Sequence, residues 1–267
     1  MLLGHGCTGG PGAVSYVFDS YIGTDPTGTK AVPNQRGVYV DGIQYARIGK
    51  NVISGNQRSG VYVQSGRTDV LENRIGLSSE LKPLGNGASG VYVGAGAHGT
   101  DVSNNFIGFN AHWGIAIDQH AAWVNASPNS IQANFGLGID WGYDMNPANG
   151  PVAVPEITSA RVENGKTIIE GTKSVPGPGI LDHEVHLYAS DAPHWTGYGE
   201  GQYTLGSIVE NGPRFTATLD VDLRGKFVTV TLTESVHLGF ARSPRGDGIH
   251  NDTGTTTSEF SHAVLVR

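Results

Sequence analysis

The sequence predicts an all-β fold, in which a right-handed parallel β-helix is followed by a β-sandwich. Three observations lead to this prediction. A glycine-centred strand motif recurs five times in residues 1–150, the second half lacks that repeat but holds several short apolar runs, and the composition is unusual. The chain has 40 glycines and only 15% charged residues, which is typical of turn-rich β proteins. We therefore expect very little helix.

The repeated motif is a glycine followed by three strand residues, as in Gly-Val-Tyr-Val. Its copies are residues 37–40, 60–63, 90–93, 114–117 and 138–141, with glycines 23, 30, 24 and 24 positions apart. A repeat of this length cannot close a core alone, but stacked coils bury a continuous column of Val and Ile. Equivalent strands of successive coils would then form parallel sheets with a spacing of about 4.8 Å.

Asparagines recur at matching places in the coils. One set precedes the motif glycines, and a second set opens a short Ile-containing strand between the motifs. The first set is Asn34, Asn56, Asn86, Asn110 and Asn134, and the second is Asn51, Asn73, Asn105 and Asn129. Asparagine tolerates left-handed backbone geometry at corners, and its amide can stack into a hydrogen-bonded ladder. The Gly and Asn positions are therefore interpreted as mostly architectural.

Two coils carry an insertion at the same corner, residues 24–33 in the first coil and 77–85 in the third. We call these segments the corner loops. Because they belong to equivalent corners, we expect them to project from one side of the stack and form a wall beside a flat sheet. The alternative is two separate solvated loops.

Several segments resemble the sequences of a known group of proteins. Residues 22–29, 51–56 and 136–140, continued by 197–202 and 257–261, are similar to bacterial right-handed β-helix proteins of the pectate-lyase-like superfold. The resemblance implies a secreted or cell-surface bacterial protein, although the start of this chain lacks the form of a signal peptide. We also expect the β-helix to be incomplete at its N-terminal end. The superfold hosts lyases, hydrolases, epimerases and adhesins, so the resemblance is specific for architecture.

The repeat stops after Trp141, and prolines at 147, 151 and 155 indicate a linker. We place the domain boundary near residue 150, with a β-helix over 1–150 and a β-sandwich over 151–267. Six or seven short runs in the second part favour antiparallel strands of an immunoglobulin-like sandwich, which the resemblance also implies. Such a sandwich would cover the last coil, or bind carbohydrate independently through the aromatic residues of 194–198.

Residues 239–254, rich in Arg, Asp and Gly, are predicted to be a long loop. Asp247, Asn251 and Asp252 in this loop are a possible calcium set, but their spacing matches no calcium loop, so we predict no cofactor. Cys7 is the only cysteine, which excludes an intrachain disulfide, and no Cys/His spacing predicts a metal site.

The charge pattern limits the partners. The formal net charge of −7 divides into −2 over residues 1–150, from 8 basic and 10 acidic residues, and −5 over the rest, from 9 and 14. Basic residues are scattered singly, so we expect neither a nucleic acid nor an anionic membrane as partner, and no apolar stretch is long enough to span a membrane. A neutral or cationic partner is favoured, and the sequence does not indicate an oligomeric state.

Alternation within the motif assigns side chains to faces. If the valines fill the bore, the middle position of each strand faces outward. These outward residues are Tyr39, Tyr62, Tyr92, Ala116 and Asp140. A ladder of exposed tyrosines suits the apolar faces of pyranose rings, whereas the alternative is an aromatic stack that only stabilises the sheet.

Acidic residues follow at the end of this stripe. Asp118 and Asp140 are expected about 8 Å apart on one face by diagonal-pair geometry, which fits the ~6.5–9.5 Å separation of an inverting glycosidase pair. His120 adds an imidazole that can act as acid or base. We take Asp118, His120, Asp140 and Asp144 as the candidate catalytic cluster, lined by His112 and Trp113. The alternatives are a solvated carboxylate for Asp118 and a turn-binding carboxylate for Asp140.

The leading hypothesis is a polysaccharide that lies along the tyrosines and is modified by a hydrolase, lyase or epimerase. The competing hypothesis is a non-catalytic secreted or cell-surface module with an adhesive or structural role. No catalytic serine elbow, phosphate-binding loop, dinucleotide fingerprint or zinc-protease helix is present in the sequence.

Overall fold

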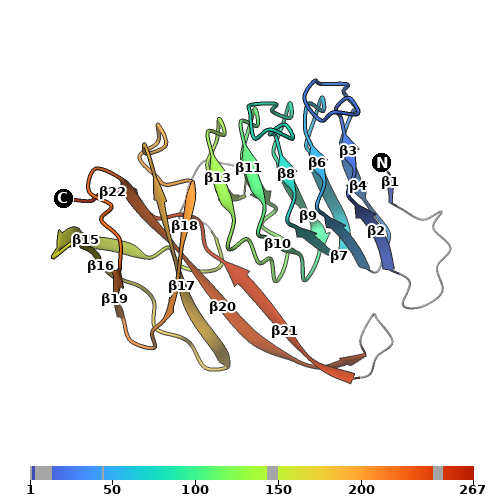
Figure 1. Ribbon diagram of the computed structural model, residues 1–267. Helices are drawn as coiled ribbons and strands as arrows, with labels where there is room; N and C mark the ends of the chain where they lie inside the picture. The colour runs from blue at the N-terminus through green and yellow to red at the C-terminus, as the bar shows by residue number, and fades with distance from the viewer. Residues whose placement is uncertain (1, 4–13, 44, 143–149, 243–248) are drawn as a thin grey trace.

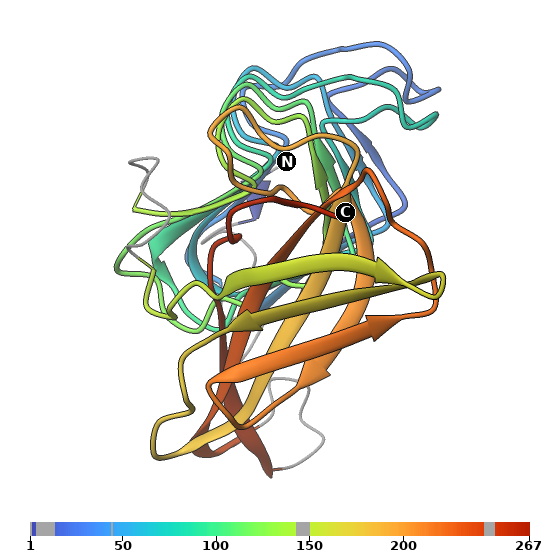
Figure 2. The same ribbon diagram turned by 90° about the vertical axis from the view of Figure 1, so that its left-hand side faces the viewer.

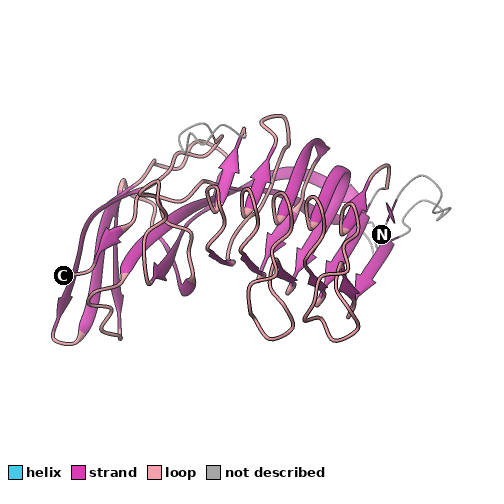
Figure 3. Ribbon diagram, turned by 90° about the horizontal axis from the view of Figure 1, so that it is seen from above, coloured by secondary structure: helices cyan, strands magenta, loops and turns pink. Residues whose placement is uncertain are grey.

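The computed structural model describes residues 2–3, 14–43, 45–142, 150–242 and 249–267, and of these 2–3, 238–242 and 249–253 are described by their backbone alone. Every regular element in the described part of the chain is a strand, as Figures 1 and 3 show. The expectation of an all-β fold with very little helix is confirmed. Accordingly, no helix in this part is long and apolar enough to cross a membrane.

The N-terminal part is a stack of parallel coils with three faces. The first face holds β1 (Leu2–Leu3), β4 (Val38–Val40), β7 (Val61–Leu71), β9 (Val91–Ala97), β12 (Ile115–Ile117) and β14 (Ile139–Trp141). The second face holds β2 (Val14–Phe18), β5 (Tyr45–Gly49), the end of β7, and β10 (Asp101–Ser103). The third face holds β3 (Tyr21–Ile22), β6 (Val52–Ile53), β8 (Arg74–Ile75), β11 (Phe106–Gly108) and β13 (Ser130–Gln132).

The five motif copies pair with one another in the predicted register. Val38 lies opposite Val61, Val61 opposite Val91, and Ile115 lies between Val91 and Ile139. These side chains are buried in the bore, as the alternation predicts. The motif glycine is explained by close approach of the coils: a Cβ on Gly114 would lie 2.5 Å from the carbonyl oxygen of Gly138.

The corner asparagines form two buried hydrogen-bonded ladders. In the first ladder each side-chain amide donates to the Oδ1 of the next asparagine at 2.9–3.3 Å, in the order Asn34, Asn56, Asn86, Asn110, Asn134. The second ladder repeats this at 2.9–3.0 Å, in the order Asn51, Asn73, Asn105, Asn129. The architectural interpretation of these positions agrees with the observed bonding.

The two corner loops lie against each other and project from one side of the stack (Figure 2, blue and teal). The backbone N–H of Ser79 donates to the carbonyl of Gly28 at 2.9 Å, so the loops form the expected wall. They lean over the third face, because a Cβ on Gly28 would meet the Tyr21 ring at 2.7 Å and Arg74 donates to the Ser79 carbonyl at 2.7 Å. The wall therefore borders the third face, whereas the tyrosine ladder lies on the first face.

The C-terminal part is a sandwich of two antiparallel sheets. One sheet holds β15 (Glu156–Glu163), β16 (Lys166–Thr172) and β19 (Arg214–Leu219). The other sheet, which we call the contact sheet, holds β18 (Tyr203–Val209), β17 (Ile180–Ser190), β20 (Phe227–Arg242), β21 (Ile249–Thr257) and β22 (Val264–Leu265). Between them lies a buried core that includes Ile169, Val185, Leu187, Phe215 and Val230.

The prediction of a long loop over residues 239–254 is wrong for its described part. β20 and β21 continue as a paired ribbon in which Gly239 lies opposite Asp252 and Arg242 opposite Ile249. Backbone pairing needs no apolar side chains, so a polar segment can extend a hairpin. Of the possible calcium residues, Asp247 lies outside the described residues, as do the side chains of Asn251 and Asp252.

The outer side of the contact sheet covers the last coil, as Figure 1 shows for β18 beside β13. Tyr188 and Phe260 from the sandwich belong to the same buried cluster as the Val and Ile column of the bore. Glu200 accepts a hydrogen bond from the backbone N–H of Asn134 at 3.0 Å, and Glu259 accepts one from the backbone N–H of Trp141 at 2.6 Å. The sandwich thus supplies apolar cover and acceptors to a coil edge that would otherwise be exposed.

Candidate functional site

Three tyrosines form a ladder on the outer side of the first face. Tyr39 lies opposite Tyr62 and Tyr62 opposite Tyr92 in the strand register. The ring centroids are 5.3 Å apart for the first pair and 4.3 Å for the second, whose rings are nearly parallel at 12°. All three side chains are partly exposed, whereas the valines between them are buried. The face assignment made from the sequence holds for these residues.

Arg36 joins the ladder, which the sequence analysis missed. Its guanidinium lies 4.5 Å from the centroid of Tyr62 and 5.2 Å from that of Tyr39, within cation–π range. The sequence does contain a sign of this role, because Arg36 directly precedes the first motif glycine in a region with few charged residues. The ladder therefore combines aromatic rings with a fixed cation.

Trp113 holds the position equivalent to that of Arg36, directly before a motif glycine, three coils further along the stack. The motif glycines Gly37 and Gly90 each donate a backbone hydrogen bond to the residue before the next motif glycine, Ser59 at 3.2 Å and Trp113 at 3.0 Å. Trp113 is partly exposed and its ring packs against Gly136, while the exposed His112 meets it edge-on at 5.5 Å between centroids. Both residues directly precede the motif glycine Gly114 and β12 of the first face.

The phenol of Tyr62 is held neutral. Burial, together with the neighbouring Tyr92, raises the pKa of Tyr62 to about 12 even though Arg36 lies over the ring. A neutral phenol can both donate and accept a hydrogen bond. On the other side of the ladder, Ser65 donates to Asp41 at 2.9 Å, which adds a carboxylate and a hydroxyl to the edge of the same face.

Asp118 and His120 form a pair just after β12. The Oδ1 of Asp118 lies 3.0 Å from Nδ1 of His120 and also accepts the backbone N–H of His120 at 2.9 Å. The His120 side chain is 70% exposed and that of Asp118 only 20%. The carboxylate thus orients an imidazole on a tight turn, and its Nε2 side is accessible to a ligand. This arrangement is suitable for general acid or base chemistry.

Asp140 does not share this accessible surface. Asp140 lies in register with Ala116, as the sequence alignment of the coils predicts. Both residues, however, are fully buried. The expectation that Asp140 presents a carboxylate on an open face beside Asp118 is therefore not met. Alternation assigned the correct side of the strand but could not show that this side is covered at the last coils. Asp144 lies outside the described residues.

The aromatic segment 194–198 is only partly available as a binding surface. Trp195 is 70% exposed and lies 6.4 Å from the ring of Phe135, which is itself 69% exposed. His194 is buried, and Tyr198 is stacked on His262 at 3.9 Å. Trp195 with Phe135 therefore forms the exposed aromatic pair here, and Phe135 was not identified from the sequence.

Two further features bear on ligands. Among the described residues, no group of three or more His, Cys, Asp or Glu side chains is arranged to hold a metal ion. A depression of about 360 Å³ lies beside the corner loops on the third face, lined by Tyr21, Arg74, Lys50, Asp19 and Glu72. Its charges are mixed in sign, and it is separate from the tyrosine ladder.

Comparison with known proteins agrees with the architecture. A search against curated proteins finds no match. The family described as right handed beta helix region matches residues 36–180, which is more than half of the chain. The match covers the coils from β4 to β14 and extends into the first strands of the sandwich. The chain therefore belongs to the right-handed β-helix family.

Proposed function

We propose that this protein binds a polysaccharide along the tyrosine ladder of the first face. The observation that carries the proposal is the in-register stack of three partly exposed tyrosines with a guanidinium over two of them. Aromatic faces pack against the apolar C–H faces of pyranose rings, while neighbouring polar groups bond the hydroxyls. Arg36, Asp41 and Ser65 provide such polar groups beside the rings.

A parallel β-helix suits a long chain-like ligand. Its repeated strands offer equivalent positions about 4.8 Å apart along the axis, so a linear polymer can lie across several coils and contact the same type of residue repeatedly. The family membership is compatible with this proposal but does not distinguish an enzyme from a non-catalytic binding protein.

A catalytic role is the second part of the proposal. The Asp118–His120 pair lies on the coil after Tyr92, so a polymer bound on the ladder would reach it. The imidazole would act as general base or acid in cleavage or in proton transfer at the sugar, with Asp118 as its positioning residue.

The competing function is binding without catalysis. The burial of Asp140 favours it, because the paired-carboxylate mechanism needs two accessible carboxyl groups on either side of the bond. If the protein is an enzyme, its catalysis depends on His120 and not on a pair of carboxylates.

Binding is tested by affinity electrophoresis against a panel of neutral and acidic polysaccharides. The Tyr62→Ala, Tyr92→Ala double variant should lose most of the retardation that the wild type shows. Tyr16→Ala is the matched control, because Tyr16 is 58% exposed on the second face, and its retardation should equal that of the wild type. Equal retardation of all three proteins, or none on any polysaccharide, would overturn the binding proposal.

Catalysis is tested on whichever polysaccharides bind. New reducing ends indicate hydrolysis, and unsaturated products that absorb in the ultraviolet indicate a lyase. His120→Ala should abolish product formation while leaving retardation unchanged, since the imidazole acts after binding. If products form at the same rate in this variant, the site assignment is wrong.

A further inference from the structure

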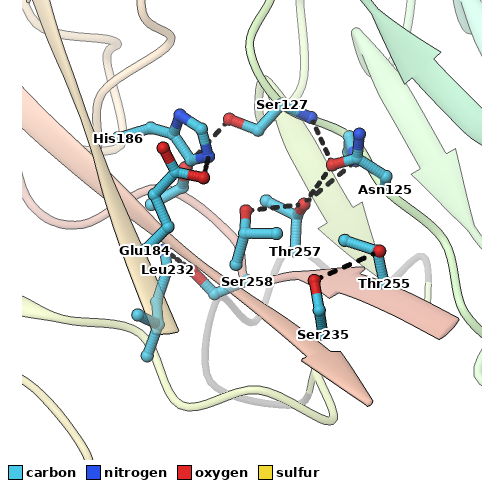
Figure 4. A network of polar contacts seen from close by, with 12 residues as sticks. Asn125, Ser127, Glu184, His186, Leu232, Ser235, Thr255, Thr257 and Ser258 are labelled. Carbon is cyan, nitrogen blue, oxygen red and sulfur yellow. Dashed lines mark hydrogen bonds and ion pairs between the residues drawn. The ribbon is translucent and has the colours of Figure 1, made fainter. Parts of the chain in front are cut away.

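A cavity of about 470 Å³ lies where the last coil meets the contact sheet. Figure 4 shows its network: Asn125 and Ser127 approach from the coil, and Glu184, His186, Ser235 and Thr255 from the sandwich. Its volume is within the usual range for small-molecule sites. The cavity is separate from the tyrosine ladder and from the Asp118–His120 pair, and the sequence analysis did not identify it.

One strand supplies its ionisable groups. Along β17, Val185 and Leu187 belong to the sandwich core, whereas Glu184 and His186 lie on the opposite side and line the cavity with Asp182. Neighbouring strands add hydroxyl groups at the same level, because Glu184 pairs with Thr233 and Asp182 pairs with Ser235 on β20. The period of two in a strand thus places three titratable side chains on one wall.

His186 is the buried polar group of this wall. The residue is 8% exposed, and the Oε2 of Glu184 lies 3.6 Å from its Nε2, beyond hydrogen-bond distance. Burial lowers the pKa of His186, with Glu184 opposing the shift, so the ring is neutral near pH 7 and offers both a donor and an acceptor. A buried imidazole that faces a cavity in this way is prepared to bond a guest molecule.

The cavity favours a guest rich in donors. Asp182 and Glu184 are its charged residues, and no Lys or Arg among the residues that the structure describes lines it. Several lining hydroxyls are already hydrogen-bonded to each other. The hydroxyls of Ser235 and Thr255 are 3.3 Å apart, and those of Thr233 and Thr257 are 3.0 Å apart, so one hydroxyl hydrogen of each pair is engaged. What remains is mainly acceptor capacity on carboxylate and hydroxyl oxygens, which disfavours an anionic ligand.

A metal ion is a poorer guest than an organic cation. In the described part of the chain, no three acidic or histidine side chains converge closely enough to coordinate a metal. Alternate residues on an extended strand are separated by about 6.6 Å, so Asp182, Glu184 and His186 reach different parts of a larger ligand. Pro128, which is partly exposed, adds apolar lining surface for a ring.

We propose that this cavity binds an amino sugar, a pyranose unit that carries a protonated amine. The ammonium group would bond to Glu184 and Asp182, its hydroxyls to His186 and the Ser/Thr side chains, and its ring would pack against the apolar lining. The proposal does not depend on polysaccharide binding by the tyrosine ladder.

The test is isothermal titration calorimetry of the full chain with glucosamine, glucose and glucuronate at one pH and ionic strength. Glucosamine should bind saturably and at least about tenfold more tightly than glucose, a difference of about 1.4 kcal/mol, since its ammonium group bonds to the carboxylates. Glucuronate should not bind. Absence of saturable glucosamine binding, or equal affinity for glucose, would overturn the proposal.

Variants locate the binding. Glu184→Gln and, separately, Asp182→Asn should each weaken glucosamine binding about tenfold or more while the unfolding temperature stays near that of the wild type. Asp220→Asn removes the same charge from an exposed position paired with Lys166 and should leave binding unchanged. The Tyr62→Ala, Tyr92→Ala double variant should also bind normally, which separates this site from the ladder. Equal loss in Asp220→Asn would show unspecific charge attraction and overturn the proposal.

Discussion

Buried corner amides are the residues on which the stacking of the coils depends most directly. Asn110 is 1% exposed, donates through its backbone N–H and its side chain to Asn134, and accepts both equivalent bonds from Asn86. Each inner asparagine of the first ladder therefore satisfies polar groups of two neighbouring coils. Buried polar groups that lose their partners cost considerably more than an exposed bond is worth.

Asn110→Ala should lower the free energy of unfolding by about 3 kcal/mol, because it leaves the N–H groups of Asn86 without their acceptor in a buried place. Asn34→Ala is the matched control at the exposed end of the same ladder and should cost less than about 1 kcal/mol. Urea unfolding of the two variants measures the difference. Equal losses would contradict the role of the ladder.

Glu200 ends the first ladder in place of a further asparagine. Its Oε1 accepts the backbone N–H of Asn134 at 3.0 Å, and its Oε2 accepts that of Ala133 at 2.8 Å. Burial nevertheless raises the pKa of Glu200 from 4.5 to about 7, although these amide donors oppose the shift. A proton is therefore bound more tightly by the folded chain than by the unfolded one.

This shift predicts a pH dependence of stability. The contribution of Glu200 is fully present below pH 4.5 and is lost as the pH rises through about 7, because the unfolded chain ionises first. Relative to Glu200→Gln, which does not titrate, the wild type should lose about 3 kcal/mol of unfolding free energy across this window. Urea unfolding of both proteins at pH 4.5 and pH 8 measures it. A constant difference between them would mean that the carboxyl is not perturbed.

At the scale of strands, the sequence predicted the repeated contacts between coils, but it did not predict the contacts that other parts of the chain make with the coils. The motif glycines and corner asparagines give the coil register directly, since their spacing reflects contacts between equivalent residues such as Gly114 and Gly138. The buried state of Asp140 depends on what covers the last coils, and periodicity carries no information about such cover. For the same reason, the cavity at His186 was not foreseen, because it results from contacts between the last coil and the sandwich.

The β20–β21 ribbon shows a second limit of sequence reasoning. It contains glycines and charged residues, so it lacks the apolar alternation that marks a half-buried strand. Its strand form comes from backbone pairing with a neighbour that the local sequence does not specify.

The motif glycine makes a prediction at this scale. Gly114→Ala should destabilise the protein by about 1–3 kcal/mol, because the added Cβ would lie 2.5 Å from the Gly138 carbonyl and 2.9 Å from the Ile131 side chain. Gly212→Ala is the control, since nothing lies within 4 Å of its added Cβ, and it should be neutral. Thermal unfolding followed by circular dichroism compares them. If the Gly114→Ala variant is as stable as the wild type, the coils can move apart at this position without loss of unfolding free energy.

For the molecule as a whole, the β-helix and the sandwich share one hydrophobic cluster. Tyr188 and Phe260 lie within 5.1 Å of each other between ring centroids, and both join the cluster that fills the bore. A coil stack with an open end exposes apolar cross-section and unpaired strand groups, so this junction protects the end of the stack. The two parts should therefore unfold together.

Phe260→Ala tests this coupling. Phe260 is 3% exposed, and its removal should lower the free energy of unfolding by about 3–5 kcal/mol, as for other buried phenylalanines. Hydrogen exchange should show the coil amide of Val93 and the sandwich amide of Val230 losing protection to the same extent, because Tyr188 and Phe260 join the bore cluster that holds Val93 to the sandwich whose own core holds Val230. Phe106→Ala, at a residue 46% exposed on the third face, should change neither amide appreciably. Loss of protection confined to Val230 would instead mean that the coils are stable alone, and that the sandwich is attached to the stack without supporting it.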